Sequence, residues 1–190
     1  MKRFLSIIKD KKNILNILRI LLGISLIMAA CGKILPVGAY YKCGYIPLEL
    51  FLSQIIKYHF PLPKILIEIS TIPLITFELL IGLLLVFNTR VKFALILLQI
   101  LMFFMIPITL WGTFMGVSDC GCYGNLVKRP PWVATIEDFL ILVLCFLLYP
   151  RYKENKKTNI KIDILILFIC LSCAIYTFWQ LLQIWKLNAG

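Results

Sequence analysis

The sequence predicts an all-α integral membrane protein with five transmembrane helices. Of its 190 residues, 61% are hydrophobic and 15% are charged, whereas a typical soluble domain has roughly 45–50% apolar and about 25% charged residues. The apolar residues also occur in blocks of about 20, the length of α-helix that crosses a hydrocarbon core of roughly 30 Å. The predicted spans are residues 14–36, 65–87, 91–115, 133–149 and 163–185.

Basic residues between the spans predict the orientation. The formal net charge is +11, but Lys and Arg lie in the gaps between apolar blocks, so we expect a lipid bilayer and no nucleic acid as partner. Cytoplasmic loops carry the excess of Lys and Arg. The most basic segments are the N-terminal tail, the turn after the second span and the link before the fifth, which places the N-terminus in the cytoplasm. They contain Lys2, Arg3, Lys9, Lys11 and Lys12, then Arg90 and Lys92, then Arg151, Lys153, Lys156, Lys157 and Lys161.

The loop between the first two spans is the longest connection. This loop, the shorter connections and the two tails contain too few residues for a separate water-soluble domain. We therefore predict one membrane domain over residues 1–190. Within this loop, residues 47–58 predict a short amphipathic helix that Pro47 starts. Such a helix would lie flat on the outer surface of the membrane, as an anchor or as a lid over an outward-facing site. Its apolar face consists of Leu48, Phe51, Leu52 and Ile55.

The most informative motif is Cys120-Gly121-Cys122, in the predicted outer loop between the third and fourth spans. An extended chain separates residues i and i+2 by roughly 6.6–7.2 Å, whereas a disulfide requires Cα atoms about 4.4–6.8 Å apart. The backbone must therefore bend, which Gly121 permits, and the small ring would be strained and easily reduced. These properties favour redox exchange, with a structural disulfide or a metal site as alternatives. A metal would need further ligands, and since His59 is the only histidine, we predict no metal site.

The other cysteines are weaker candidates. Seven cysteines leave at least one thiol unpaired unless it binds another chain. Cys43 in the first outer loop and Cys31 near the end of the first span are possible electron relays. Cys170 and Cys173 form a C-x-x-C inside the fifth span, where neither a strand nor a helix N-terminus favours a thiolate. We expect them to be packing residues, as we expect for Cys145.

Ionisable side chains inside the spans are costly and indicate pairing or function. Glu78 in the second span and Arg19 in the first lie at comparable depths, so we expect a buried ion pair, with a proton or acceptor site at Glu78 as the alternative. Glu137 and Asp138 open the fourth span. Because Thr135 and Asp138 have the spacing of a capping box, we expect them to cap the helix, with proton exchange with a thiol as the alternative role of the two carboxylates.

Together these residues resemble the DoxX-like membrane proteins and, within them, the MauE group. The likeness covers roughly residues 15–150. The resemblance implies an antiparallel four-helix bundle over residues 14–150 in the bacterial inner membrane, to which the span at 163–185 is an addition. The motifs that carry the resemblance are Arg19-x-x-Leu22-Gly23, Gly32-Lys33, Glu78 with Gly82, and Asp119-Cys120-Gly121-Cys122-Tyr123-Gly124.

The resemblance also implies a function. MauE-like proteins act alongside a thioredoxin-like partner in forming the disulfides of a periplasmic enzyme such as the small subunit of methylamine dehydrogenase. We therefore expect a membrane thiol-disulfide oxidoreductase with a periplasmic Cys120-Cys122 loop, a thioredoxin-like or disulfide-containing partner protein, and quinone as a candidate electron acceptor. The alternative is a non-catalytic assembly or anchor subunit of a DoxX-type, quinone-linked electron-transfer complex. Cys31 and the fifth span depart from the family pattern.

Overall fold

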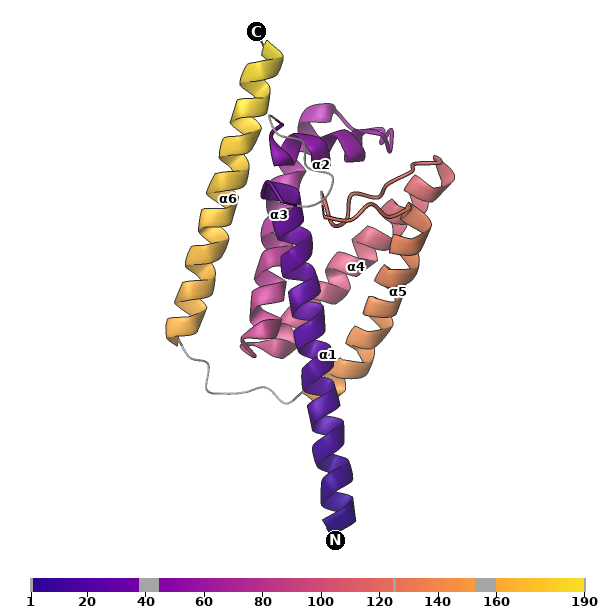
Figure 1. Cartoon of the computed structure of the whole chain (residues 1–190), viewed down its shortest axis with the longest axis vertical. Coiled ribbons are helices and arrows are strands. Elements are labelled where there is room, and N and C mark those ends of the chain that lie inside the picture. Colours follow the sequence, from indigo (N-terminus) through magenta and orange to yellow (C-terminus); the bar gives the residue numbers. More distant parts are fainter. Residues whose placement is uncertain (1, 38–44, 125, 153–159, 190) are drawn as a thin grey trace.

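The computed structural model describes residues 2–37, 45–124, 126–152 and 160–189, and this part of the chain is helical without strands (Figure 1). Five of its helices are long and apolar enough to cross a membrane. The predicted all-α class and the five spans are confirmed. The helices are α1 (Lys2–Ile34), α2 (Pro47–Ile56), α3 (Lys64–Val86), α4 (Val91–Phe114), α5 (Pro131–Leu148), the 3₁₀ helix η1 (Tyr149–Arg151) and α6 (Ile160–Ala189).

The transmembrane helices pack in pairs. α1 packs along α3 and α4 along α5, while α6 lies against α3 on the outside of the first pair. The α1-α3 pair is closest at Gly23 and Gly82, where a Cβ atom on either residue would lie 2.8 Å from the other's backbone oxygen. Small residues allow helix backbones in a membrane to approach in this way. This contact fixes the register of α1 against α3.

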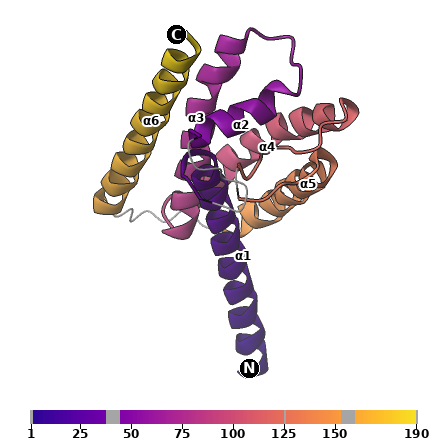
Figure 2. The same ribbon diagram turned by 45° about the horizontal axis from the view of Figure 1, so that its top comes forward.

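The two ends of the bundle differ. The N-terminus, the α3-α4 turn and η1 lie at one end, whereas α2 and the α4-α5 loop lie at the other (Figures 1 and 2). We call the latter the α2 end. The predicted helix at 47–58 is present as α2, and it lies across this end of the bundle. Its residues Leu48, Phe51 and Leu52 are at most 3% exposed, so its apolar face covers the helices beneath it.

Polar contacts attach α6 at the same end. The side chain of Gln180 donates to the carbonyl of Ile34 at 2.8 Å and accepts from the backbone N–H of Leu48 at 3.2 Å. The indole N–H of Trp185 donates to the carboxylate of Glu68 at 2.7 Å. Because these groups are buried or half-buried, their hydrogen bonds replace contacts that water would otherwise supply. They fix α6 relative to α1, α2 and α3.

Replacing Gly82 with Ala should destabilise the fold. The new methyl group would meet the backbone of Gly23, so the helices must separate. Overpacking of this kind costs about 1–3 kcal/mol of unfolding free energy. Denaturation of the purified protein in detergent, followed by circular dichroism, measures the loss. The control is Phe77→Leu on the same helix, at a side chain that is 45% exposed, and equal stability of the two variants would contradict the prediction.

Candidate functional site

The carboxylate of Asp119 organises the α4-α5 loop that carries the two cysteines. It accepts hydrogen bonds from the backbone N–H groups of Gly121 at 3.3 Å and Arg129 at 3.1 Å, and from the side-chain amide of Gln54 at 2.9 Å. The backbone N–H of Cys120 in turn donates to the carbonyl of Arg129 at 2.7 Å. The loop is therefore closed on itself and joined to α2 by a single buried carboxylate.

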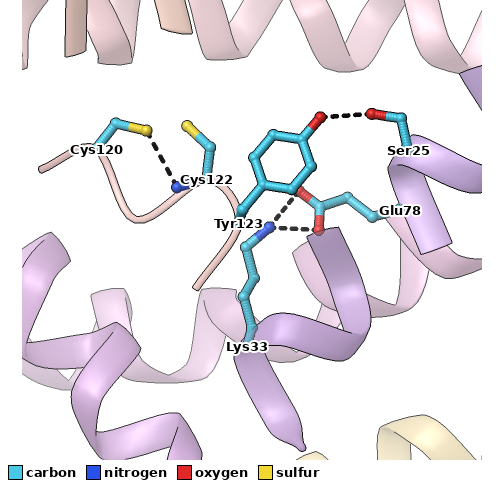
Figure 3. A network of polar contacts seen from close by, with 6 residues as sticks. All are labelled: Ser25, Lys33, Glu78, Cys120, Cys122 and Tyr123. Atoms are coloured by element: carbon cyan, nitrogen blue, oxygen red, sulfur yellow. Dashed lines mark hydrogen bonds and ion pairs between the residues drawn. The ribbon is translucent and has the colours of Figure 1, made fainter. Parts of the chain in front are cut away.

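The predicted bend at Gly121 is present. Its φ of +70° lies in the left-handed region, and a Cβ atom there would be 2.8 Å from the side-chain oxygen of Gln54. The bend brings the backbone N–H of Cys122 to 3.2 Å from the sulfur of Cys120. Both sulfur atoms lie side by side on the same side of the loop, and both are free thiols (Figure 3). The geometry therefore suits exchange between a dithiol and a disulfide.

The same loop packs tightly against the end of α1. A Cβ atom on Gly32 would lie 2.3 Å from the carbonyl oxygen of Tyr123, and one on Gly124 would lie 2.3 Å from the carbonyl oxygen of Gly32. The hydroxyl of Tyr123 reaches Ser25 at 2.5 Å, deeper in the bundle (Figure 3). These contacts seat the cysteine loop within the α2 end of the bundle.

A buried ion pair joins α1 to α3, but its cation is not the expected one. The ammonium group of Lys33 contacts the two carboxylate oxygens of Glu78 at 2.6 and 2.5 Å, with side chains 2% and 10% exposed (Figure 3). Arg19 instead donates to the carbonyl of Leu85. The predicted Glu78-Arg19 pair is wrong because the antiparallel register at Gly23 places Arg19 and Glu78 on opposite sides of the helix contact.

The predicted capping box is also wrong. α5 begins at Pro131, and no side chain caps it. Thr135 lies one turn inside the helix, where its hydroxyl donates to Pro131 at 2.9 Å. Glu137 forms an ion pair with Arg129. Asp138 lines a cavity, and one of its carboxylate oxygens is buried without a hydrogen-bond partner among the described residues.

A cavity of about 400 Å³ connects these groups. It lies at the α2 end, where Phe51 and Ile55 of α2 form part of its wall. Most of its wall is apolar. The chemically active residues on the wall are Cys120, Cys122, Lys33, Glu78 and Asp138.

Lys33, Tyr58 and Thr109 also line this cavity and were not among the candidate site residues. The sequence connects Lys33 with the family likeness through Gly32-Lys33 but does not predict it as a site residue, because a lysine in the last turn of a span usually extends to the headgroups. The hydroxyl of Tyr58 donates to the carbonyl of Cys120 at 3.2 Å. Burial, and then the nearby thiols, raise the pKa of Tyr58, so it remains a donor. No sequence signal pointed to Tyr58 or Thr109.

The two thiols have opposite electrostatic character. The hydrogen bond from Cys122 lowers the pKa of Cys120, against the opposing effects of burial and of the Asp119 and Asp138 charges. That same hydrogen bond, together with burial, raises the pKa of Cys122 well above its ordinary value, while Lys33 acts in the opposite direction. Cys120 is therefore the more readily ionised thiol of the pair, and Cys122 is the one that keeps its proton more strongly.

Of the two candidate relay cysteines, the structure describes Cys31, and it does not place Cys31 on the wall of the cavity. Cys31 is half-buried and is instead close enough to Cys173 on α6 for the two thiols to interact electrostatically. Cys43 falls outside the described residues. Cys145, Cys170 and Cys173 are buried among apolar side chains, in agreement with their expected packing role.

The sequence matches the family model of Methylamine utilisation protein MauE over residues 11–150. The chain belongs to the MauE family. No curated protein and no solved structure matches it. Every residue that lines the cavity lies within the segment shared with the MauE family, whereas α6 lies outside it. This MauE family member is thus a multi-pass membrane protein whose cysteine loop and cavity fall in the family's own segment.

Breaking the buried ion pair should destabilise the protein. Lys33→Met leaves the Glu78 carboxylate buried without its cation, which costs about 3–5 kcal/mol of unfolding free energy. Adding Glu78→Leu should recover most of that loss, because an apolar pair needs no compensation. Denaturation of all variants measures the coupling. Lys64→Met is the control, since Lys64 is 61% exposed and contacts Glu68 at 3.6 Å; additive losses from the two buried substitutions would refute the prediction.

Removing Cys122 should change how Cys120 titrates. In Cys122→Ala the sulfur of Cys120 keeps the backbone N–H donor at position 122 but loses the side-chain donor, so its pKa rises and less thiolate exists at any given pH. Alkylation of Cys120 by iodoacetamide in the reduced protein should therefore shift to higher pH, as measured by mass spectrometry. Cys145→Ala serves as the control and should leave the profile unchanged. An unshifted profile in Cys122→Ala would show that the hydrogen bond does not set the reactivity.

Proposed function

We propose that this MauE family protein exchanges disulfides with protein thiols through Cys120 and Cys122. One observation carries the proposal: the two sulfur atoms lie side by side at a backbone bend, where the backbone N–H of Cys122 donates to the sulfur of Cys120. In this arrangement the pKa of Cys120 is lowered and the pKa of Cys122 is raised. A structural disulfide needs no such asymmetry. Thiol-disulfide exchange does, because the attacking sulfur must be a thiolate and the leaving sulfur departs faster when its pKa is low.

The asymmetry assigns a direction to the exchange. When the Cys120-Cys122 disulfide oxidises a partner, a partner thiolate attacks one sulfur and the other leaves as a thiolate. Cys120 is the better leaving group because its pKa is lowered. The mixed disulfide therefore forms on Cys122, and a second partner thiol then releases it.

The charge pattern supports an orientation of the protein in the membrane, and the family supports a class of partner protein. The basic N-terminal tail, α3-α4 turn and α5-α6 link favour a cytoplasmic location for their end of the bundle. The α2 end, with the cysteine loop, then faces the periplasm of a bacterial inner membrane. The partner would be a thioredoxin-like protein or a disulfide-containing substrate, and the family's description favours a protein of methylamine utilisation, such as the small subunit of methylamine dehydrogenase.

A second candidate function is a non-catalytic assembly or anchor subunit. The observation that favours it is the close packing of the cysteine loop against α1 at Gly32 and Gly124, since a loop held this tightly also braces a surface for a partner. In that case Cys120 and Cys122 would form a fixed disulfide. Titration with a reduced thioredoxin-like protein distinguishes the two functions, because only an exchanging pair changes its oxidation state.

Single serine variants test the exchange. Both Cys120→Ser and Cys122→Ser should abolish disulfide formation in the partner while leaving membrane insertion intact. Cys120→Ser should still trap a mixed disulfide with a thioredoxin-like protein, and Cys122→Ser should trap at least tenfold less, because Cys122 is the sulfur on which the mixed disulfide is proposed to form. Non-reducing electrophoresis and mass spectrometry measure the trapped complex.

Cys170→Ser on α6 is the control and should behave as the wild type. Full activity of both single variants at the cysteine pair would remove the proposed function. Failure to capture any mixed disulfide, together with a Cys120-Cys122 bond that does not respond to reductant, would favour the assembly function instead.

A further inference from the structure

We propose that the cavity beside Cys122 binds a lipid-soluble quinone, which accepts the electrons of the reduced Cys120-Cys122 pair. This inference rests on the proposed thiol-disulfide function, because a pair that oxidises a partner must itself be reoxidised. The acceptor is assigned here from the shape, position and polarity of the cavity.

The cavity has the size and lining of a small-molecule site. Its volume of about 400 Å³ falls within the range of about 300–1,000 Å³ that is usual for ligand pockets. A few polar groups interrupt a wall that is otherwise apolar, the arrangement that orients a flat ring with oxygen atoms at its edge. The apolar wall includes Phe51, Leu74, Met102, Met105, Ile108 and Ile141.

The cavity reaches the surface of the bundle on a face that meets lipid. Leu62 and Ser70, which line it beside α3, are exposed, and Leu62 is 56% exposed. Met105 and Ile108 line it from α4. α3 and α4 diverge toward the α2 end because each packs along a different partner helix (Figures 1 and 2). A ligand that enters between two membrane spans comes from the bilayer, which favours a molecule with a hydrocarbon tail over a water-soluble oxidant.

The polar part of the cavity matches the oxygen atoms of a quinone. The charge of Lys33 acts on the thiol of Cys122, and the charge of Asp138 acts on both thiols. One carboxylate oxygen of Asp138 is buried with no hydrogen-bond partner among the described residues. Such an oxygen is costly unless a ligand proton meets it. The hydroxyl of a quinol supplies that proton.

The reaction balances with these two reactants alone. Cys120 and Cys122 lose two electrons and two protons as their S–S bond forms. The quinone gains both electrons, and its two carbonyl oxygens take up two protons to become hydroxyls. Asp138 and the Lys33-Glu78 pair hold protons between the sulfurs and the ring. One dithiol and one quinone therefore give one disulfide and one quinol.

Decylubiquinone tests the proposal on the full-length protein in phosphatidylcholine nanodiscs. The protein is reduced, freed of reductant and mixed with an equal amount of decylubiquinone. We expect one quinol per protein, measured by ultraviolet absorbance, and the loss of two alkylatable thiols at Cys120 and Cys122, measured by mass spectrometry. The same preparation is titrated separately with an oxidised and a reduced thioredoxin-like protein, which reports the thiol exchange without quinone.

Met105→Trp fills the cavity and is expected to slow quinone reduction at least tenfold while leaving exchange with the thioredoxin-like protein unchanged. Phe103→Trp is the matched control, since it adds the same ring on the same helix at a side chain that is 70% exposed, and it should react like the wild type. Leu74→Trp fills the cavity from α3 and replaces Met105→Trp if that variant does not fold.

Each outcome decides between the two proposals. Thiol exchange without quinone reduction by the wild type would overturn the quinone site and leave the proposed function standing. Quinone reduction at equal rates in the filled-cavity variant and in Phe103→Trp would also overturn the site. A wild-type protein that shows neither reaction would remove the proposed function, and with it the acceptor site that depends on it.

Discussion

The arrangement of the site depends on the buried ion pair between Lys33 and Glu78. A charge in the interior of a membrane bundle is costly unless it is paired, so each side chain requires the other. The pair joins α1 to α3 and keeps two polar side chains on the wall of a cavity that is otherwise apolar. The glycine contact between the same helices sets the register, and the ion pair uses the alignment that this contact creates.

The cysteine loop completes the wall of that cavity. The loop enters the bundle because Gly32 and Gly124 have no side chains to prevent it, and Asp119 satisfies its backbone N–H groups once it is there. The result is a thiol pair that is partly shielded from water and close to charged groups. In such surroundings a hydrogen bond to the sulfur of Cys120 is stronger than it would be in water, because little water competes with it.

Local features of the sequence predicted local features of the structure. The bend at Gly121 follows from the short spacing of its two cysteines, and the start of α2 at Pro47 follows from the fixed backbone of proline. The predictions that failed concerned pairs of residues on different helices, or the first residue of a helix. Arg19 and Glu78 have comparable predicted depths, but the contact of Gly23 with Gly82 places them on opposite sides of it along the antiparallel helices. The fourth span begins at Pro131, so Thr135 and Asp138 lie too far along the helix to cap it.

The sequence by itself determined that this protein has five membrane spans, because the length and hydropathy of a segment suffice to predict whether it crosses a bilayer. It also singled out Cys120 and Cys122, since their spacing is a covalent property of the chain. Only the tertiary structure decided that Lys33 is the partner of Glu78 and that Asp138 shares a cavity with the two thiols. These contacts depend on helix register and rotation, which result from the packing of side chains distant in sequence.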